Sequence, residues 1–160
     1  MLGMLRRLVI CLCAAVANAI AQKGTGFGII LGDPTGLTLK HWVSRDQAIA
    51  ASLGGSYYGA PRIGLDYLWH FNAFRSSIVL LYGDAGLAIG FGKGVRWWGD
   101  RAYKYYDRND ARIGVRGMVG INVLPRGVPL EFFLELGPLV TIAPGFASTV
   151  DVALGMRIYP

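Results

Sequence analysis

Residues 149–159 alternate strictly between two kinds of side chain, and no other feature of the sequence constrains the fold as much. One parity is wholly apolar and consists of Val150, Val152, Leu154, Met156 and Ile158. The other parity is small or charged and consists of Asp151, Ala153, Gly155 and Arg157. Because successive side chains of a β-strand point to opposite faces of the sheet, the segment predicts a strand with one apolar face.

Seven earlier segments repeat this alternation and are separated by residues typical of turns, such as Asp33-Pro34-Thr35-Gly36. The eight predicted strands cover residues 26–31, 37–43, 48–57, 62–71, 78–91, 111–121, 130–138 and 149–159. His41 and Trp42 depart from the alternation of the second segment, and the seventh strand is expected to end at Pro138.

The charged residues of these strands all fall on the parity that is not apolar. They are five bases and five acids: Lys40, Arg62, Arg112, Arg116, Arg157, Asp66, Asp84, Glu131, Glu135 and Asp151. A basic side chain facing lipid near mid-bilayer costs ~2–4 kcal/mol. If the sheet spans a membrane, these charges must therefore face its interior. Because buried ions need partners, we expect a lumen network of ion pairs.

The first 21 residues are predicted to be a cleaved signal peptide. Arg6 and Arg7 precede an apolar run over residues 8–17, and Ala19 and Ala21 provide a cleavage site of small residues. Both cysteines of the chain lie inside this segment. The predicted mature domain, residues 22–160, therefore has neither a disulfide nor a thiolate metal site.

Composition agrees with a strand-built membrane protein. Hydrophobic residues make up 53% of the chain, yet no 18 of them are consecutive in the mature part, so alternation must disperse them. The sequence therefore predicts an all-β fold, an eight-stranded antiparallel up-and-down transmembrane β-barrel. A soluble barrel of lipocalin type would be apolar inside, which is the reverse polarity. The net charge of +6 is scattered, which gives no support to nucleic-acid binding.

Three segments carry a resemblance to a known group: residues 32–40 (GDPTGLTLK), 131–138 (EFFLELGP) and 155–159 (GMRIY). The chain resembles the small eight-stranded outer-membrane barrels of the OmpA/OmpX kind, and more narrowly a group of bacterial outer-membrane barrels with no known reaction. The resemblance implies residence in a Gram-negative outer membrane, insertion by the barrel-assembly machinery, and contact with outer-membrane lipids and lipopolysaccharide. We expect a monomer.

Catalytic and metal-binding motifs are incomplete in this sequence. Residues 86–94 lack the first glycine and the final Ser or Thr of a phosphate loop, and residues 107–110 lack the glycine and glutamate of a calcium loop. Ser44 and His41 would point to opposite faces of a strand. We expect no catalytic, cofactor or metal site and predict a structural or interaction protein. The alternative is an outer-membrane enzyme acting on lipid or lipopolysaccharide.

The longest predicted connection, residues 92–109, combines cations with aromatic rings. Its candidate binding residues are Lys93, Arg96, Trp97, Trp98, Arg101, Tyr103, Lys104, Tyr105 and Tyr106. Such residues suit anionic headgroups, including lipopolysaccharide phosphates, or a protein partner. Alternatively, these aromatics rest on the membrane interface. Aromatics at strand ends, including Tyr58 and Tyr159, are expected to form interfacial girdles.

Overall fold

The protein forms a single closed β-barrel. The computed structural model describes residues 24–92 and 111–160. The predicted signal peptide and all nine candidate residues of the long loop lie outside these ranges. The strands are β1 (Thr25–Gly32), β2 (Thr35–Trp42), β3 (Gln47–Ser56), β4 (Gly59–Phe71), β5 (Val79–Gly90), β6 (Arg112–Val123), β7 (Leu130–Ala143) and β8 (Ala147–Ile158).

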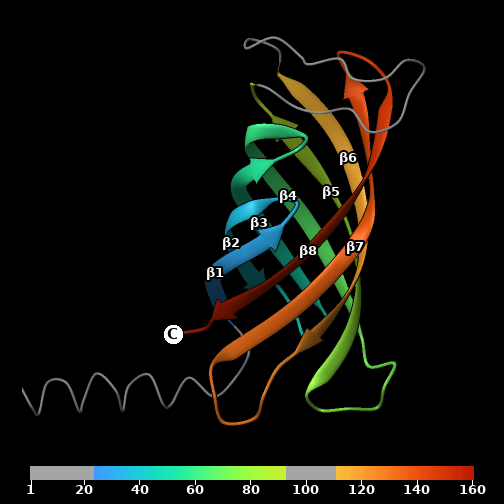
Figure 1. The fold of residues 1–160 in the computed structure, drawn as a ribbon. Helices are drawn as coiled ribbons and strands as arrows, with labels where there is room; N and C mark the ends of the chain where they lie inside the picture. Colours follow the sequence, from blue (N-terminus) through green and yellow to red (C-terminus); the bar gives the residue numbers. More distant parts are fainter. Residues whose placement is uncertain (1–23, 93–110) are drawn as a thin grey trace, which may run out of the picture.

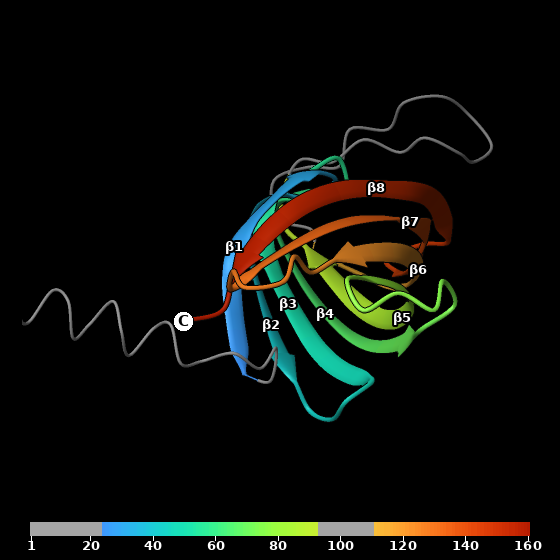
Figure 2. The ribbon, with the colours of Figure 1, turned by 90° about the horizontal axis from the view of Figure 1, so that it is seen from below.

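Each strand pairs antiparallel with the strands before and after it in the chain. The barrel closes where β1 meets β8, with Phe27 opposite Ile158 and Gly32 opposite Ala153. Figures 1 and 2 show this closed ring from the side and from below. The predicted all-β, eight-stranded up-and-down architecture is therefore confirmed. The described residues contain no helix long and apolar enough to cross a bilayer.

The two ends of the barrel differ in what they carry. At the loop end lie the turns after β1, β3 and β7, and here β5 ends at Gly90 and β6 begins at Arg112. At the terminal end lie Gly24, Pro160 and the turns after β2, β4 and β6. Strands β5 to β8 rise further at the loop end than β1 and β2, so the wall is uneven (Figure 1).

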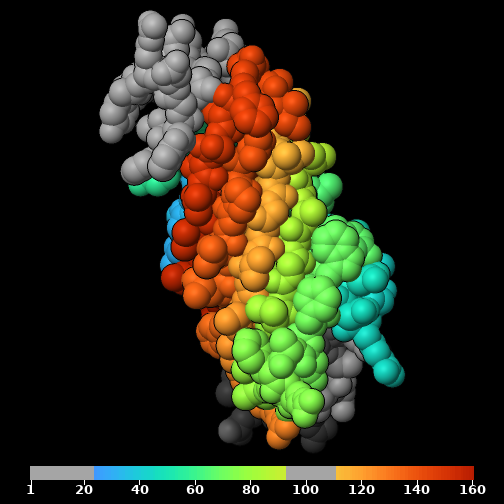
Figure 3. Space-filling model, turned by 90° about the vertical axis from the view of Figure 1, so that its right-hand side faces the viewer, coloured from blue at the N-terminus to red at the C-terminus, as the bar shows by residue number. Residues whose placement is uncertain are grey.

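The barrel is apolar outside and polar inside, as the strand alternation requires. On β8, Val150, Val152 and Leu154 are 65%, 52% and 53% exposed, whereas Asp151 and Arg157 are buried. The same alternation runs through β6 and β7. Figure 3 shows the outer side chains of β4 to β8 as a continuous wall. A surface of this kind is suited to hydrocarbon rather than to water.

Three aromatic residues occupy positions that the sequence analysis did not anticipate. Trp42 is buried and His41 is exposed, so the alternation of β2 continues without a break to its end. Tyr58 and Tyr159 are also buried, at 5% and 6% exposure, so the expectation that they join an outer girdle was wrong. Each ring fills one mouth of the lumen, where burial of its large apolar area is favourable.

The seventh strand continues past the proline at which it was expected to end. Pro138 pairs with Val150 of β8, and β7 extends to Ala143. Proline lacks the N–H that a ladder needs. The pairing between β6 and β7 omits two residue pairs here, between Arg116↔Leu139 and Val119↔Leu136. The strand therefore accommodates Pro138 by losing pairs on the β6 side, while its pairing with β8 continues.

Val119 offers a test of the outer surface, because it is 57% exposed near the middle of β6. Val119→Arg should lower the stability of the barrel in lipid vesicles by ~2–4 kcal/mol, because it places a cation in hydrocarbon. Val119→Leu is the matched control and should unfold at nearly the wild-type urea concentration. Equal stabilities of the two variants would show that this face does not contact lipid.

Candidate functional site in the barrel lumen

The ten charged strand residues all lie inside the barrel. None of them is more than 7% exposed. They come from six of the eight strands, namely β2 and β4 to β8, because inward positions recur at every second residue. Such burial is costly for any ion without a partner, so the contacts of each group decide whether the lumen is stable.

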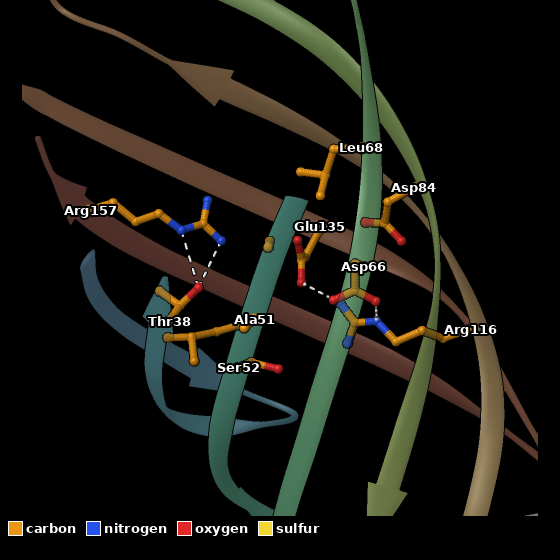
Figure 4. A pocket seen from close by; sticks show the side chains of 11 residues that line it. Thr38, Ala51, Ser52, Asp66, Leu68, Asp84, Arg116, Glu135 and Arg157 are labelled. Atoms are coloured by element: carbon orange, nitrogen blue, oxygen red, sulfur yellow. Dashed lines mark hydrogen bonds and ion pairs between the residues drawn. The ribbon is translucent and has the colours of Figure 1, made fainter. Parts of the chain in front are cut away.

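Arg116 of β6 is the centre of the network. Its Nε lies 2.7 Å from Oδ1 of Asp66, and its terminal nitrogens lie 3.1 Å from Oε1 of Glu135 and 3.5 Å from Oδ2 of Asp151. One guanidinium thus ties β6 to β4, β7 and β8. Figure 4 shows Arg116 with its ion pairs to Asp66 and Glu135. The planar fork of arginine can serve several carboxylates at once, which lysine cannot match.

A second cluster surrounds Glu131 near the terminal end. The carboxylate lies 3.1 Å from Nζ of Lys40 and 2.7 Å from a terminal nitrogen of Arg157. Tyr159 donates its hydroxyl hydrogen to the same carboxylate at 2.6 Å. The indole of Trp42 in turn donates to the Tyr159 oxygen at 3.2 Å. The acid is therefore fully satisfied although it has no contact with solvent.

His70 extends this second cluster. Its Nε2 lies 3.0 Å from Nζ of Lys40, and its Nδ1 lies 3.2 Å from the backbone oxygen of Asp46. An ammonium group can only donate, so Nε2 must accept and the ring proton sits on Nδ1. The ring also packs against Trp42 and Tyr82. These contacts position His70 as a neutral acceptor for a buried lysine.

A third cluster lies at the loop end. Arg62 donates to Asp151 and, at 3.4 Å, to Asp33. Arg112 donates to the carbonyl of Gly92, and the guanidiniums of both arginines lie within 6 Å of the Tyr58 ring. Burial raises the pKa of the Tyr58 phenol, against the opposing influence of the nearby arginines. The ring is therefore a neutral partner for two cations.

The sequence analysis missed several members of the network. Tyr82 donates to Glu135 at 2.6 Å, and Thr38 accepts from Arg157 at 2.9 Å. Both share the inward parity of their strands, so parity alone could have identified them. Asp33 was interpreted as a turn residue, and its contact with Arg62 depends on barrel closure. The sequence analysis assigned no individual pairs, and the structure pairs Glu131 with Lys40 and Arg157.

Inward glycines make room for tyrosine rings rather than only for long basic side chains. A Cβ at Gly120 would collide with the ring of Tyr82, and a Cβ at Gly26 would collide with the ring of Tyr159. These positions require glycine because the rings lie directly across the strand backbone. The rings can then reach Glu135 and Glu131 with their hydroxyl groups.

Little free space remains in the lumen. A cavity of about 10 Å³ lies between the Arg116 and Arg157 clusters. This volume is about that of one water molecule. Among residues 24–92 and 111–160, no group of three or more His, Cys, Asp or Glu side chains is arranged to hold a metal ion.

Comparisons with known proteins identify a similar fold. No family model and no curated protein matches the chain. The N-terminal β-barrel domain of Pseudomonas aeruginosa OprF has a TM-score of 0.57 and 17% sequence identity. The match covers 84% of this chain and 93% of that domain. This chain has the fold of an OmpA-like eight-stranded outer-membrane barrel. The resemblance inferred from the sequence is thus confirmed at the level of the fold.

Arg116→Met tests the centre of the network in this OmpA-like barrel. The variant should unfold ~3–5 kcal/mol more readily than wild type, because it leaves Asp66 and Glu135 buried without their shared cation. Arg126→Met is the control, since Arg126 is exposed in the turn after β6 and should matter by less than ~0.5 kcal/mol. Urea titration in detergent micelles gives both values. An Arg116→Met barrel as stable as wild type would mean that the network adds nothing to stability.

Proposed function

We propose that this chain is a structural or interaction protein of the Gram-negative outer membrane, with a closed lumen and no catalytic activity. The fold supports a structural outer-membrane protein, and the apolar outer wall suits a lipid environment. The observation that carries the proposal is the filled interior. Ion pairs link β2, β4, β6, β7 and β8 across the lumen, and the cavity beside Arg116 has a volume of only about 10 Å³.

A filled lumen leaves the two ends of the barrel as the places where function can reside. Loops held by a rigid scaffold commonly carry binding residues. We therefore retain the basic and aromatic connection between β5 and β6 as the candidate binding loop, including Lys93, Arg96, Trp97 and Trp98. Its proposed partners are lipopolysaccharide and other outer-membrane lipids, and the monomeric barrel would be inserted by the barrel-assembly machinery.

The buried histidine of the lumen, His70, gives the alternative of a lipid-directed enzyme no specific support. His70 contacts Lys40 and the Asp46 carbonyl, and no serine is among its hydrogen-bond partners. A nucleophile next to a general base is what a hydrolase of this kind would require. We therefore do not propose a reaction.

The proposed membrane location and the closed lumen each predict a measurable result. The mature chain should fractionate with outer membranes and migrate differently on a gel before and after boiling, because the folded barrel resists detergent. In planar bilayers it should give no large steady conductance, since the arginine and tyrosine side chains obstruct the interior. A sustained porin-like current would contradict a closed lumen, and recovery as a soluble periplasmic protein would contradict the membrane location.

The placement of the candidate loop can be tested separately. The termini of such barrels face the periplasm, so the connection between β5 and β6 should lie outside the cell. An epitope tag inserted after Gly99 should bind antibody on intact cells. A tag after Arg126, at the terminal end, is the matched control and should bind only after the outer membrane is permeabilised. The reverse pattern would mean that the topology is inverted.

A further inference from the structure

The apolar belt on the outside of the barrel differs in height from one side to the other. On β7 the outward positions from Phe132 to Ile142 are all apolar. That interval measures about 34 Å along an antiparallel strand and about 25 Å across a bilayer at the usual strand tilt. On β1 the outward apolar residues run only from Phe27 to Leu31. The corresponding height across the bilayer is about 10 Å, so the belt on β1 is much lower than the belt on β7.

The neighbouring strands β2 and β3 share the short belt of β1. Their outward apolar residues run from Leu37 to Leu39 and from Ile49 to Leu53. Leu37 is the direct partner of Leu53, and the three strands lie side by side in the wall. Figure 1 shows that β1 and β2 end below β6 to β8 on the loop side of the barrel. The outward side chains of β1 to β3 therefore form one continuous surface, here called the low face.

Outward polar side chains border the low face at the terminal end. Thr25 and His41 are direct partners on β1 and β2, both are exposed, and the Thr25 hydroxyl lies 2.8 Å from Nδ1 of His41. On β3, Gln47 accepts a hydrogen bond from the Tyr67 hydroxyl at 2.8 Å. Trp69 lies directly opposite Gln47 and is 40% exposed. Tryptophan at such a position is typical of the depth at which hydrocarbon meets headgroups.

A second polar border limits the low face at the loop end. Thr35 shares the outward parity of Leu37 and is exposed. Its hydroxyl accepts the backbone N–H of Gly32 at 3.1 Å and donates to the carbonyl of Gly32 at 2.8 Å. Tyr57 follows the end of β3 and is 60% exposed, as expected for an interfacial aromatic residue. The low face thus has polar residues at both ends and a short apolar belt between them.

The low face continues into the lipid-facing wall, since Leu31 of β1 is the direct partner of Leu154 of β8 and both point outward. A hydrocarbon core of ordinary thickness, ~30 Å, suits the belt of β7 but would bury both polar borders of the low face. Tilting the barrel would raise or lower the low face without changing its height, so the lipid must adapt. We propose that the low face binds lipid in a locally thinned bilayer, an inference that rests on the proposed membrane location.

The experiment maps the lipid contacts of the wild-type barrel in nanodiscs of palmitoyl-oleoyl phosphatidylcholine by nuclear magnetic resonance. Backbone amides along β7 should show cross-relaxation with acyl chains. On the low face only the amides between the polar borders should do so, whereas those of Thr25, His41 and Thr35 should contact headgroups or water. Acyl contacts at these three amides as strong as those along β7 would overturn the proposal, as would a low face without any acyl contacts. Absence of acyl contacts along β7 as well would contradict the membrane location itself.

Lengthening the low face provides an independent test. Thr25→Val combined with His41→Leu adds one apolar row about 5 Å high. Relative to wild type, the unfolding equilibrium constant of this variant should fall about tenfold in dioleoyl compared with dilauroyl phosphatidylcholine vesicles, because its mismatch with the thicker bilayer is smaller. Ser148→Leu is the matched control, since it adds an outward apolar residue to β8 beside Val140 of β7. This control should keep the wild-type dependence on bilayer thickness. Equal responses of the two variants would overturn the proposal.

Discussion

A charge enclosed by a closed wall of strands must find its partner inside that wall. Removing one partner of a buried pair costs several kcal/mol, which is a large part of a typical folding free energy of ~5–15 kcal/mol. In this barrel single charged side chains meet the requirement by contacting several partners at once. Arg116 serves three carboxylates, and Glu131 is held by Lys40, Arg157 and Tyr159. The network links strands that are far apart in the chain and so supports barrel closure.

Aromatic side chains supply further contacts to the buried charges and fill the space between the ion pairs. Tyr82 and Tyr159 donate to carboxylates, while Trp42 and Tyr58 pack against cations. A tyrosine ring fills space and still satisfies a buried acid through its hydroxyl. This combination explains why the cavity between the Arg116 and Arg157 clusters is small although the lumen carries so many charges.

The sequence by itself determined the architecture and the ten strand charges that face the lumen. Strict alternation requires two faces, and the position of every strand charge on one parity requires that face to be inside. It could not determine the pairs, because partners such as Arg157 and Glu131 meet only through the register of β7 and β8. It also misjudged Pro138, since a proline can stay in a strand that keeps its pairing on one side and omits pairs on the other.

The tertiary structure alone decided which residues close the mouths and which turn residue joins the charges of the lumen. Tyr159 shares the parity of Arg157, but only closure of β1 onto β8 places its ring over Gly26. Asp33 becomes a lumen acid because the curved wall carries a turn residue inward toward Arg62. That sixth acid breaks the equality of five acids and five bases counted along the strands. Alternation is a local property of the chain, whereas charge pairing depends on distances that exist only after the barrel has closed.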